Sequence, residues 1–157
     1  MNMSEKSNNS GYLTATLNNR CPRCRRGKLF VESNPYKLKA NIKMHEKCTV
    51  CGQPTDLEVG FYYGTAYVSY GLTVAFSLTT FIAWWLLIGF SVQTGDRRLL
   101  WWGIFNGVAL LLLQPVFMRL SRSLWLSWFV KYEPDWKNKP VKQEATERVV
   151  KEQMGNW

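Results

Sequence analysis

The sequence lacks charge over two long internal stretches. Residues 59–95 contain no Asp, Glu, Lys, Arg or His, and neither do residues 99–118. Only Asp96, Arg97 and Arg98 separate the two stretches. A soluble helical hairpin this apolar would need a large polar shell around it, which a chain of 157 residues does not supply. The missing charge therefore predicts a membrane protein.

The lengths of these stretches favour two transmembrane helices. An α-helix rises about 1.5 Å per residue, so roughly 20 apolar residues cross the hydrocarbon core of a bilayer. We expect spans at residues 67–90 and 99–118, joined by a turn at 91–98. Because neither span contains an ionisable side chain, no residue is a candidate proton or ion carrier, which argues against a transporter.

Other absences narrow the function. The first 20 residues lack the continuous apolar core of a secretory signal, and we expect residues 1–19 to be a disordered lead-in. The chain has a single histidine, His45. Outside the cysteines we find no nucleophile–base pair, paired carboxylates or glycine-rich phosphate loop. We therefore expect a protein that is not an enzyme.

What the sequence does have is two C-x-x-C pairs. Cys21 and Cys24 form the first, and Cys48 and Cys51 form the second. Each such pair folds into a tight turn that presents two thiolates, and two turns complete a tetrahedral metal site. With strands expected at residues 27–31 and 36–42, residues 20–58 predict a small β zinc ribbon.

The metal itself has two candidates. Four cysteines suffice for zinc, so His45 is expected not to be a ligand. Rubredoxin-like iron uses the same four thiolates and is the alternative. Disulfides are disfavoured because the expected compartment is reducing. A catalytic thiol pair is disfavoured because the chain has two C-x-x-C pairs, whereas such a site needs only one.

A cluster of basic residues surrounds the first cysteine pair. It comprises Arg20, Arg23, Arg25, Arg26 and Lys28. Nucleic-acid binding is one explanation. We favour compensation of the roughly −2 charge of a zinc–tetrathiolate centre, together with attraction to an anionic lipid leaflet.

Orientation and the C-terminal region follow from charge and redox chemistry. Free thiol pairs persist in the cytoplasm, and Arg119 and Arg122 follow the second span, so both termini are expected to be cytoplasmic. Residues 119–157 are expected to form a cytoplasmic helical extension and tail, with the arginines reaching the lipid headgroups.

Small residues within the spans predict close helix packing. Ser69, Thr73 and Ser77 recur every four residues on the first helix, and Gly103 and Gly107 form a G-x-x-x-G on the second. We expect both groups to pack within the hairpin. The alternative is a homodimer formed through the transmembrane helices.

Three segments together resemble a known family. They are Arg20-Cys21-Pro22-Arg23-Cys24-Arg25-Arg26-Gly27-Lys28-Leu29-Phe30, Cys48-Thr49-Val50-Cys51-Gly52, and Gly60-Phe61-Tyr62-Tyr63-Gly64-Thr65-Ala66-Tyr67-Val68-Ser69-Tyr70. The last begins in an aromatic, glycine-rich junction, residues 59–66. The layout from residue 20 to 118 resembles the bacterial membrane family called domain of unknown function 983. The resemblance implies a small inner-membrane zinc-ribbon protein without an assigned reaction, and suggests a role in building a respiratory oxidase complex.

The sequence thus predicts a multi-pass protein of the bacterial inner membrane. A zinc ribbon is followed by a helical transmembrane hairpin and a polar tail. We expect a binding or assembly module whose partners are the bilayer and a membrane or cytoplasmic protein. The alternative function is a membrane-tethered electron carrier with iron on the four cysteines.

Overall fold

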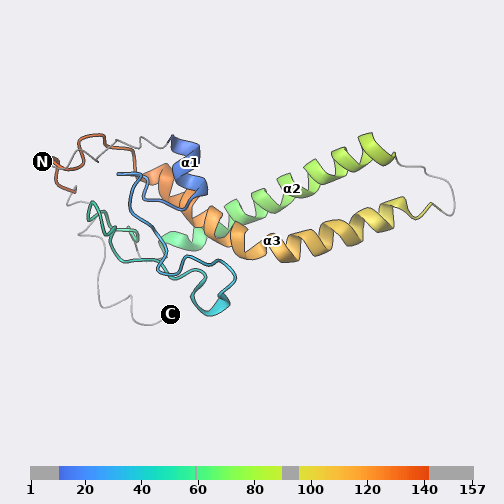
Figure 1. Cartoon of the computed structure of the whole chain (residues 1–157), viewed down its shortest axis with the longest axis horizontal. Coiled ribbons are helices and arrows are strands. Elements are labelled where there is room, and N and C mark those ends of the chain that lie inside the picture. Colours follow the sequence, from blue (N-terminus) through green and yellow to red (C-terminus); the bar gives the residue numbers. More distant parts are fainter. Residues whose placement is uncertain (1–10, 59, 90–95, 142–157) are drawn as a thin grey trace, which may run out of the picture.

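The computed structural model describes residues 11–58, 60–89 and 96–141 of the chain. Its elements, in chain order, are the helix α1 (Tyr12–Leu17), the 3-10 turns η1 (Leu38–Ala40) and η2 (Phe61–Gly64), and the long helices α2 (Thr65–Ile88) and α3 (Arg98–Phe129). Figure 1 shows α2 and α3 as a hairpin, with the N-terminal unit (residues 11–58) gathered around one end of it.

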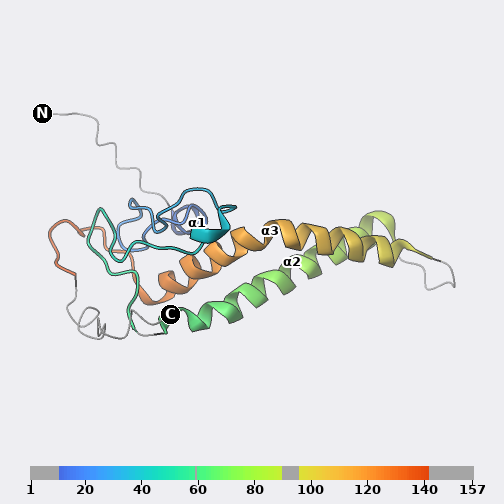
Figure 2. The same ribbon diagram turned by 90° about the horizontal axis from the view of Figure 1, so that it is seen from below.

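The helices α2 and α3 run side by side along most of their length (Figures 1 and 2). Both are long and apolar enough to cross a membrane. Their apolar side chains largely point outward, since Leu87 is 84% exposed and Leu111 is 78% exposed. The two expected spans therefore coincide with helices, although α2 begins at Thr65. Most of the expected turn at 91–98 lies outside the described residues.

Polar side chains connect the two helices at one level. Thr80 donates a hydrogen bond to Oδ1 of Asn106 at 3.0 Å, and Nδ2 of Asn106 donates to Ser77 at 3.1 Å. The expectation that Ser77 packs within the hairpin is thus confirmed. The expectation for the G-x-x-x-G is wrong, because a Cβ built on Gly103 or Gly107 meets no atom within 4 Å. Those glycines face away from α2.

The second helix does not end where the apolar run ends. α3 continues through Pro115, whose missing N–H does not break it, as far as Phe129. In this extension Arg119 is only 3% exposed, and Leu126 is fully buried. The arginine was expected to reach lipid headgroups, but it lies instead inside the contact between α3 and the N-terminal unit. The N-terminal unit therefore packs against this C-terminal part of α3.

The N-terminal unit has less regular structure than a ribbon. Within the described ranges the chain forms no β-strand, and three isolated antiparallel bridges take the place of strands: Arg20 with Lys28, Phe30 with Met44, and Lys47 with Pro54. The expected strand at 36–42 is wrong, because η1 occupies its centre. The expected disordered lead-in is wrong from Tyr12 to Leu17, where α1 forms and its Tyr12 hydroxyl bonds Ser127 of α3 at 2.8 Å.

The core of the N-terminal unit is shared with α3. Leu29 and Phe30 are buried against the cysteines, and the same cluster includes Leu126 and Val130 from the end of α3. So few apolar residues cannot stabilise a domain of this size by burial alone. The N-terminal unit therefore needs its packing against α3 and a further source of stability, for which its four cysteines are the candidates.

Candidate metal centre

Each cysteine pair lies in a closed turn of the same form. The N–H of Arg25 donates to the carbonyl of Cys21 at 2.7 Å, and the N–H of Gly52 donates to the carbonyl of Cys48 at 2.9 Å. The residue after each pair has a left-handed backbone, with φ of 55° at Arg25 and 68° at Gly52. Glycine adopts this conformation without steric cost, whereas arginine does not. The turns aim both thiols of a pair in one direction.

The two turns bring all four thiols together, as the sequence predicted. Their Sγ atoms lie within 4.8 Å of one another. The Cys21–Cys51 separation is 3.7 Å and the Cys24–Cys48 separation is 3.8 Å. Zn–S bonds of about 2.3 Å give a regular tetrahedron with an edge of about 3.8 Å. The thiols are therefore already spaced as ligands of one metal ion, and too far apart for disulfides of about 2.05 Å.

The cluster is enclosed on most sides. Cys21 is fully buried, Cys24 and Cys48 are nearly so, and Cys51 is partly exposed. A Cβ on Gly27 would lie 2.3 Å from Sγ of Cys48, so only glycine fits against this sulfur. Four protein ligands leave no open coordination position, which is the arrangement of a structural metal site rather than a catalytic one.

The thiols share their protons unequally. Hydrogen bonding with Cys21 lowers the pKa of Cys48 to about 6. Hydrogen bonding with Cys24 raises the pKa of Cys21 above its ordinary value. A divalent cation can displace the protons that the sulfurs share, because cysteines bind a metal as thiolates.

His45 stays outside the cluster. Among the described residues, the group close enough to hold a metal consists of the four cysteines alone. The backbone N–H of His45 donates to the carbonyl of Leu29 at 2.9 Å, which ties the strand-like segments together. The prediction that His45 is not a ligand agrees with this placement.

Arginines of the first turn bind the segment that follows α3. Arg23 is 6% exposed and donates to the carbonyls of Lys139 at 2.7 Å and Pro140 at 3.2 Å. The guanidinium of Arg25 lies 3.8 Å from the ring centre of Tyr132. Cation–π contacts of this kind favour arginine over lysine. Part of the basic cluster thus fastens residues 131–141 beside the cysteines, a contact that the sequence analysis missed.

A second arginine contact holds the N-terminal unit on α3. The guanidinium of Arg119 donates to the carbonyls of Ser33 at 3.1 Å and Asn34 at 2.9 Å, and also to Asn41. It lies 4.9 Å from the ring centre of Phe30. These contacts use both the charge and the flat face of the guanidinium. They fix the cysteine-bearing loops relative to the long helix.

The aromatic junction is explained by its packing against α3. Gly60 has φ of 76°, which starts η2, and a Cβ on Gly64 would lie 2.2 Å from the Trp125 ring. The indole N–H of Trp125 donates to the carbonyl of Phe61 at 2.8 Å. Both glycines are therefore needed, one for its backbone conformation and one for the close approach of an indole.

Comparison with known proteins adds no relative. The chain matches no protein-family model, no curated protein and no solved structure. The resemblance noted from the cysteine and aromatic motifs therefore stays a prediction. The function has to follow from the geometry of the thiol cluster and of the hairpin.

Proposed function

We propose that this protein is a membrane-anchored zinc module that binds and positions a partner, with no reaction of its own. The observation that carries the proposal is the gathering of four thiols, within 4.8 Å of one another, in a unit that is fastened to a long apolar hairpin. A closed metal site stabilises a recognition surface, and the hairpin holds that surface at the bilayer.

The hairpin is suited to the hydrocarbon core. Between Arg98 and Arg119 the helix α3 has only uncharged residues, and at 1.5 Å per residue they extend about 30 Å. This length equals the typical thickness of the core, so charges flank the apolar run on both sides. The contacts between Asn106, Thr80 and Ser77 satisfy polar groups within the hairpin rather than toward lipid.

Zinc is the metal that this site suits best. The ligands are four sulfurs, a set that zinc binds readily, and the two separations of 3.7 and 3.8 Å match the edge of a Zn–S tetrahedron. Removal of the metal would leave a core of Leu29, Phe30 and their α3 neighbours, which is too small to persist alone. The N-terminal unit therefore folds only with its metal bound. Free thiol ligands need a reducing compartment, so we place this unit and both termini in the cytoplasm.

Binding to a protein partner is the role that remains for such a module. The buried arginines, Arg23 and Arg119, are occupied in internal contacts, which disfavours nucleic acid as a partner. The resemblance to the domain of unknown function 983 suggests that the partner belongs to a respiratory oxidase complex of the bacterial inner membrane. Iron on the same thiolates would make the protein an electron carrier instead.

The test uses the full chain, expressed in bacteria and compared with two variants. After carbonate washing, the protein should remain in the membrane, and a specific protein should co-purify in mild detergent. Cys24→Ser should lose that partner because the metal-dependent surface collapses, whereas His45→Ala should keep it. Release of the chain by carbonate would contradict membrane anchoring. An equal yield of the partner with Cys24→Ser would contradict recognition by the metal-dependent unit.

A further inference from the structure

A loop of the N-terminal unit lies against the apolar part of α3. The side-chain amide of Asn41 donates to the carbonyl of Pro115 at 3.3 Å, and Asn41 is 3% exposed. Pro115 belongs to the uncharged run, whereas Asn41 comes directly after η1. The loop from Tyr36 to Lys43 is thereby held at a fixed level along the long helix.

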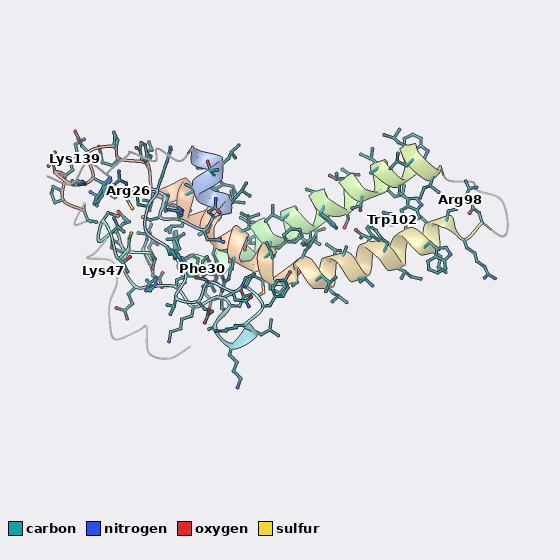
Figure 3. The ribbon with its side chains drawn as sticks, viewed as in Figure 1. Arg26, Phe30, Lys47, Arg98, Trp102 and Lys139 are labelled. Atoms are coloured by element: carbon teal, nitrogen blue, oxygen red, sulfur yellow. The ribbon has the colours of Figure 1, made fainter. Side chains whose placement is uncertain are left out.

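That level is close to the boundary of the hydrocarbon core. Pro115 lies 17 residues after Arg98, a rise of about 25 Å along α3. The core is about 30 Å thick, and Arg119, the next charged residue of α3, follows one turn later. Figure 3 shows Phe30, which Arg119 contacts, beside α3 and at the hairpin end of the N-terminal unit.

The loop exposes apolar side chains at this level. Leu38 is 75% exposed, Tyr36 is 56% exposed and Ile42 is 40% exposed. The polar Asn41, by contrast, is buried against α3, where it contacts Pro115 and Arg119. A small water-soluble unit would bury such residues in its core, so the inverted pattern indicates an apolar or amphipathic surrounding.

Lysines alternate with these apolar residues. Lys37, Lys39 and Lys43 are all exposed. Lys37 pairs with Glu32 at 2.8 Å, whereas Lys39 and Lys43 form no ion pair with any described residue. The flanking carboxylates are Glu32 and the exposed Glu46. A long apolar stem with a charged head suits the headgroup region, where the stem contacts acyl chains and the head contacts phosphate.

We propose that the loop from Tyr36 to Lys43 is a second membrane contact, which inserts Leu38 into the lipid interface and binds anionic headgroups through Lys39 and Lys43. This inference rests on the proposed membrane anchoring of the hairpin. The loop fixes the N-terminal unit in a defined orientation on the lipid surface, in the manner of other amphipathic interfacial segments.

Photocrosslinking of the full chain tests the proposal. p-Benzoylphenylalanine is placed at Leu38, at Leu111 in the exposed middle of α3, or at Lys47, which Figure 3 shows at the end of the N-terminal unit far from the hairpin. Each variant is reconstituted in vesicles of phosphatidylcholine and phosphatidylglycerol, irradiated, and weighed by mass spectrometry. Lipid adducts are expected at Leu38 and Leu111 but not at Lys47. A probe at the exposed Tyr36 repeats the Leu38 measurement.

The possible outcomes distinguish a failure of the loop contact from a failure of membrane anchoring by the hairpin. Adducts at Leu111 without adducts at Leu38 or Tyr36 would overturn the interfacial loop and leave the anchored hairpin intact. The absence of adducts at Leu111 would overturn membrane anchoring itself, and the loop contact with it. Adducts at Lys47 as frequent as those at Leu38 would also overturn the loop contact, because the position would then have no special access to lipid.

A charge comparison tests the headgroup class. Omitting phosphatidylglycerol should lower the adduct yield at Leu38 by roughly twofold or more, since each lysine near an anionic surface contributes attraction. The double variant Lys39→Gln/Lys43→Gln should lose this lipid dependence, while the Leu111 probe stays unaffected. Equal yields at Leu38 in the two kinds of vesicle would overturn the role of the anionic headgroups.

Discussion

Arg119 of α3 donates hydrogen bonds from one nitrogen, Nε, to two oxygens of Asn41: the backbone carbonyl at 2.9 Å and Oδ1 at 2.8 Å. The amide of Asn41 in turn donates to the carbonyl of Pro115, one turn earlier in the helix. This closed set of contacts joins the cysteine-bearing unit to the hairpin. A rigid joint at this point gives the N-terminal unit a fixed orientation relative to the hairpin.

Loss of the Arg119 guanidinium should loosen this joint. Arg119→Met keeps an unbranched apolar stem but leaves the carbonyls of Ser33 and Asn34 without their donor, which should cost about 2–3 kcal/mol. Hydrogen exchange in detergent should show faster exchange in the N-terminal unit and unchanged exchange in α2. Arg122→Met is the matched control, because among the described residues the half-buried Arg122 donates one hydrogen bond, to Ile42 at 3.1 Å, and otherwise stacks 4.7 Å from the Tyr62 ring centre. Equal effects of the two variants would contradict the joint.

Gly64 should not tolerate a side chain. In Gly64→Ala the new methyl would displace the Trp125 ring and its hydrogen bond to Phe61, at a cost of about 1–3 kcal/mol. Thermal unfolding in detergent measures the loss. Gly71→Ala is the control, since a Cβ there meets no atom within 4 Å. A Gly64→Ala protein as stable as Gly71→Ala would show that the indole does not need this close approach.

Asp56 should make stability depend on pH. Its Oδ1 is buried without a hydrogen-bond partner among the described residues, and burial raises its pKa above 3.8 although the charge of Arg122 opposes this. The folded state therefore binds the proton more tightly, and the stability falls as the pH rises from 3.8 through the folded-state pKa. Asp56→Asn should stabilise the protein by about 1 kcal/mol at neutral pH.

Melting curves at several pH values check this expectation. The advantage of Asp56→Asn should shrink as the pH is lowered, because the wild-type carboxyl then becomes neutral too. Glu46→Gln is the control, because Glu46 is exposed. An Asp56→Asn protein that is less stable than the wild type at neutral pH would mean that the carboxylate has a stabilising partner.

Metal removal should unfold one part of the molecule only. A strong chelator should abolish protection from proteolysis in the N-terminal unit, whose buried core is small, and leave the helical hairpin in its detergent or bilayer. Limited proteolysis followed by mass spectrometry distinguishes the two parts. Resistance of the N-terminal unit after complete metal removal would mean that α3 packing alone holds it.

The sequence predicted those features that depend on spacing and composition. The four cysteines meet because two C-x-x-C turns can present thiols to one point. The two long helices of the hairpin cover most of the two stretches that lack charged residues. The predicted strands at 27–31 and 36–42 did not form, because the backbone there pairs only in isolated bridges and folds into the 3-10 turn η1. Short segments with partial alternation are decided by such tertiary contacts.

Other features left little signal in the local sequence. Arg119 looks like a residue at a membrane boundary, and only the fold places three loop carbonyls around its guanidinium. Arg23 and Arg25 look like a solvated basic cluster until the segment containing Tyr132 returns to cover them. The aromatic residues of that returning segment were the one available hint. Long-range contacts of this kind cannot be read from local pattern.

We have proposed that the four cysteines hold one zinc ion in a membrane-anchored unit. The decisive measurement is elemental analysis of the full chain, extracted from membranes in mild detergent under reducing conditions. We expect colourless protein with one zinc per chain, retained in His45→Ala and lost in Cys24→Ser. Iron with a visible absorbance that dithionite bleaches, or a wild-type chain that is folded and free of metal, would contradict it.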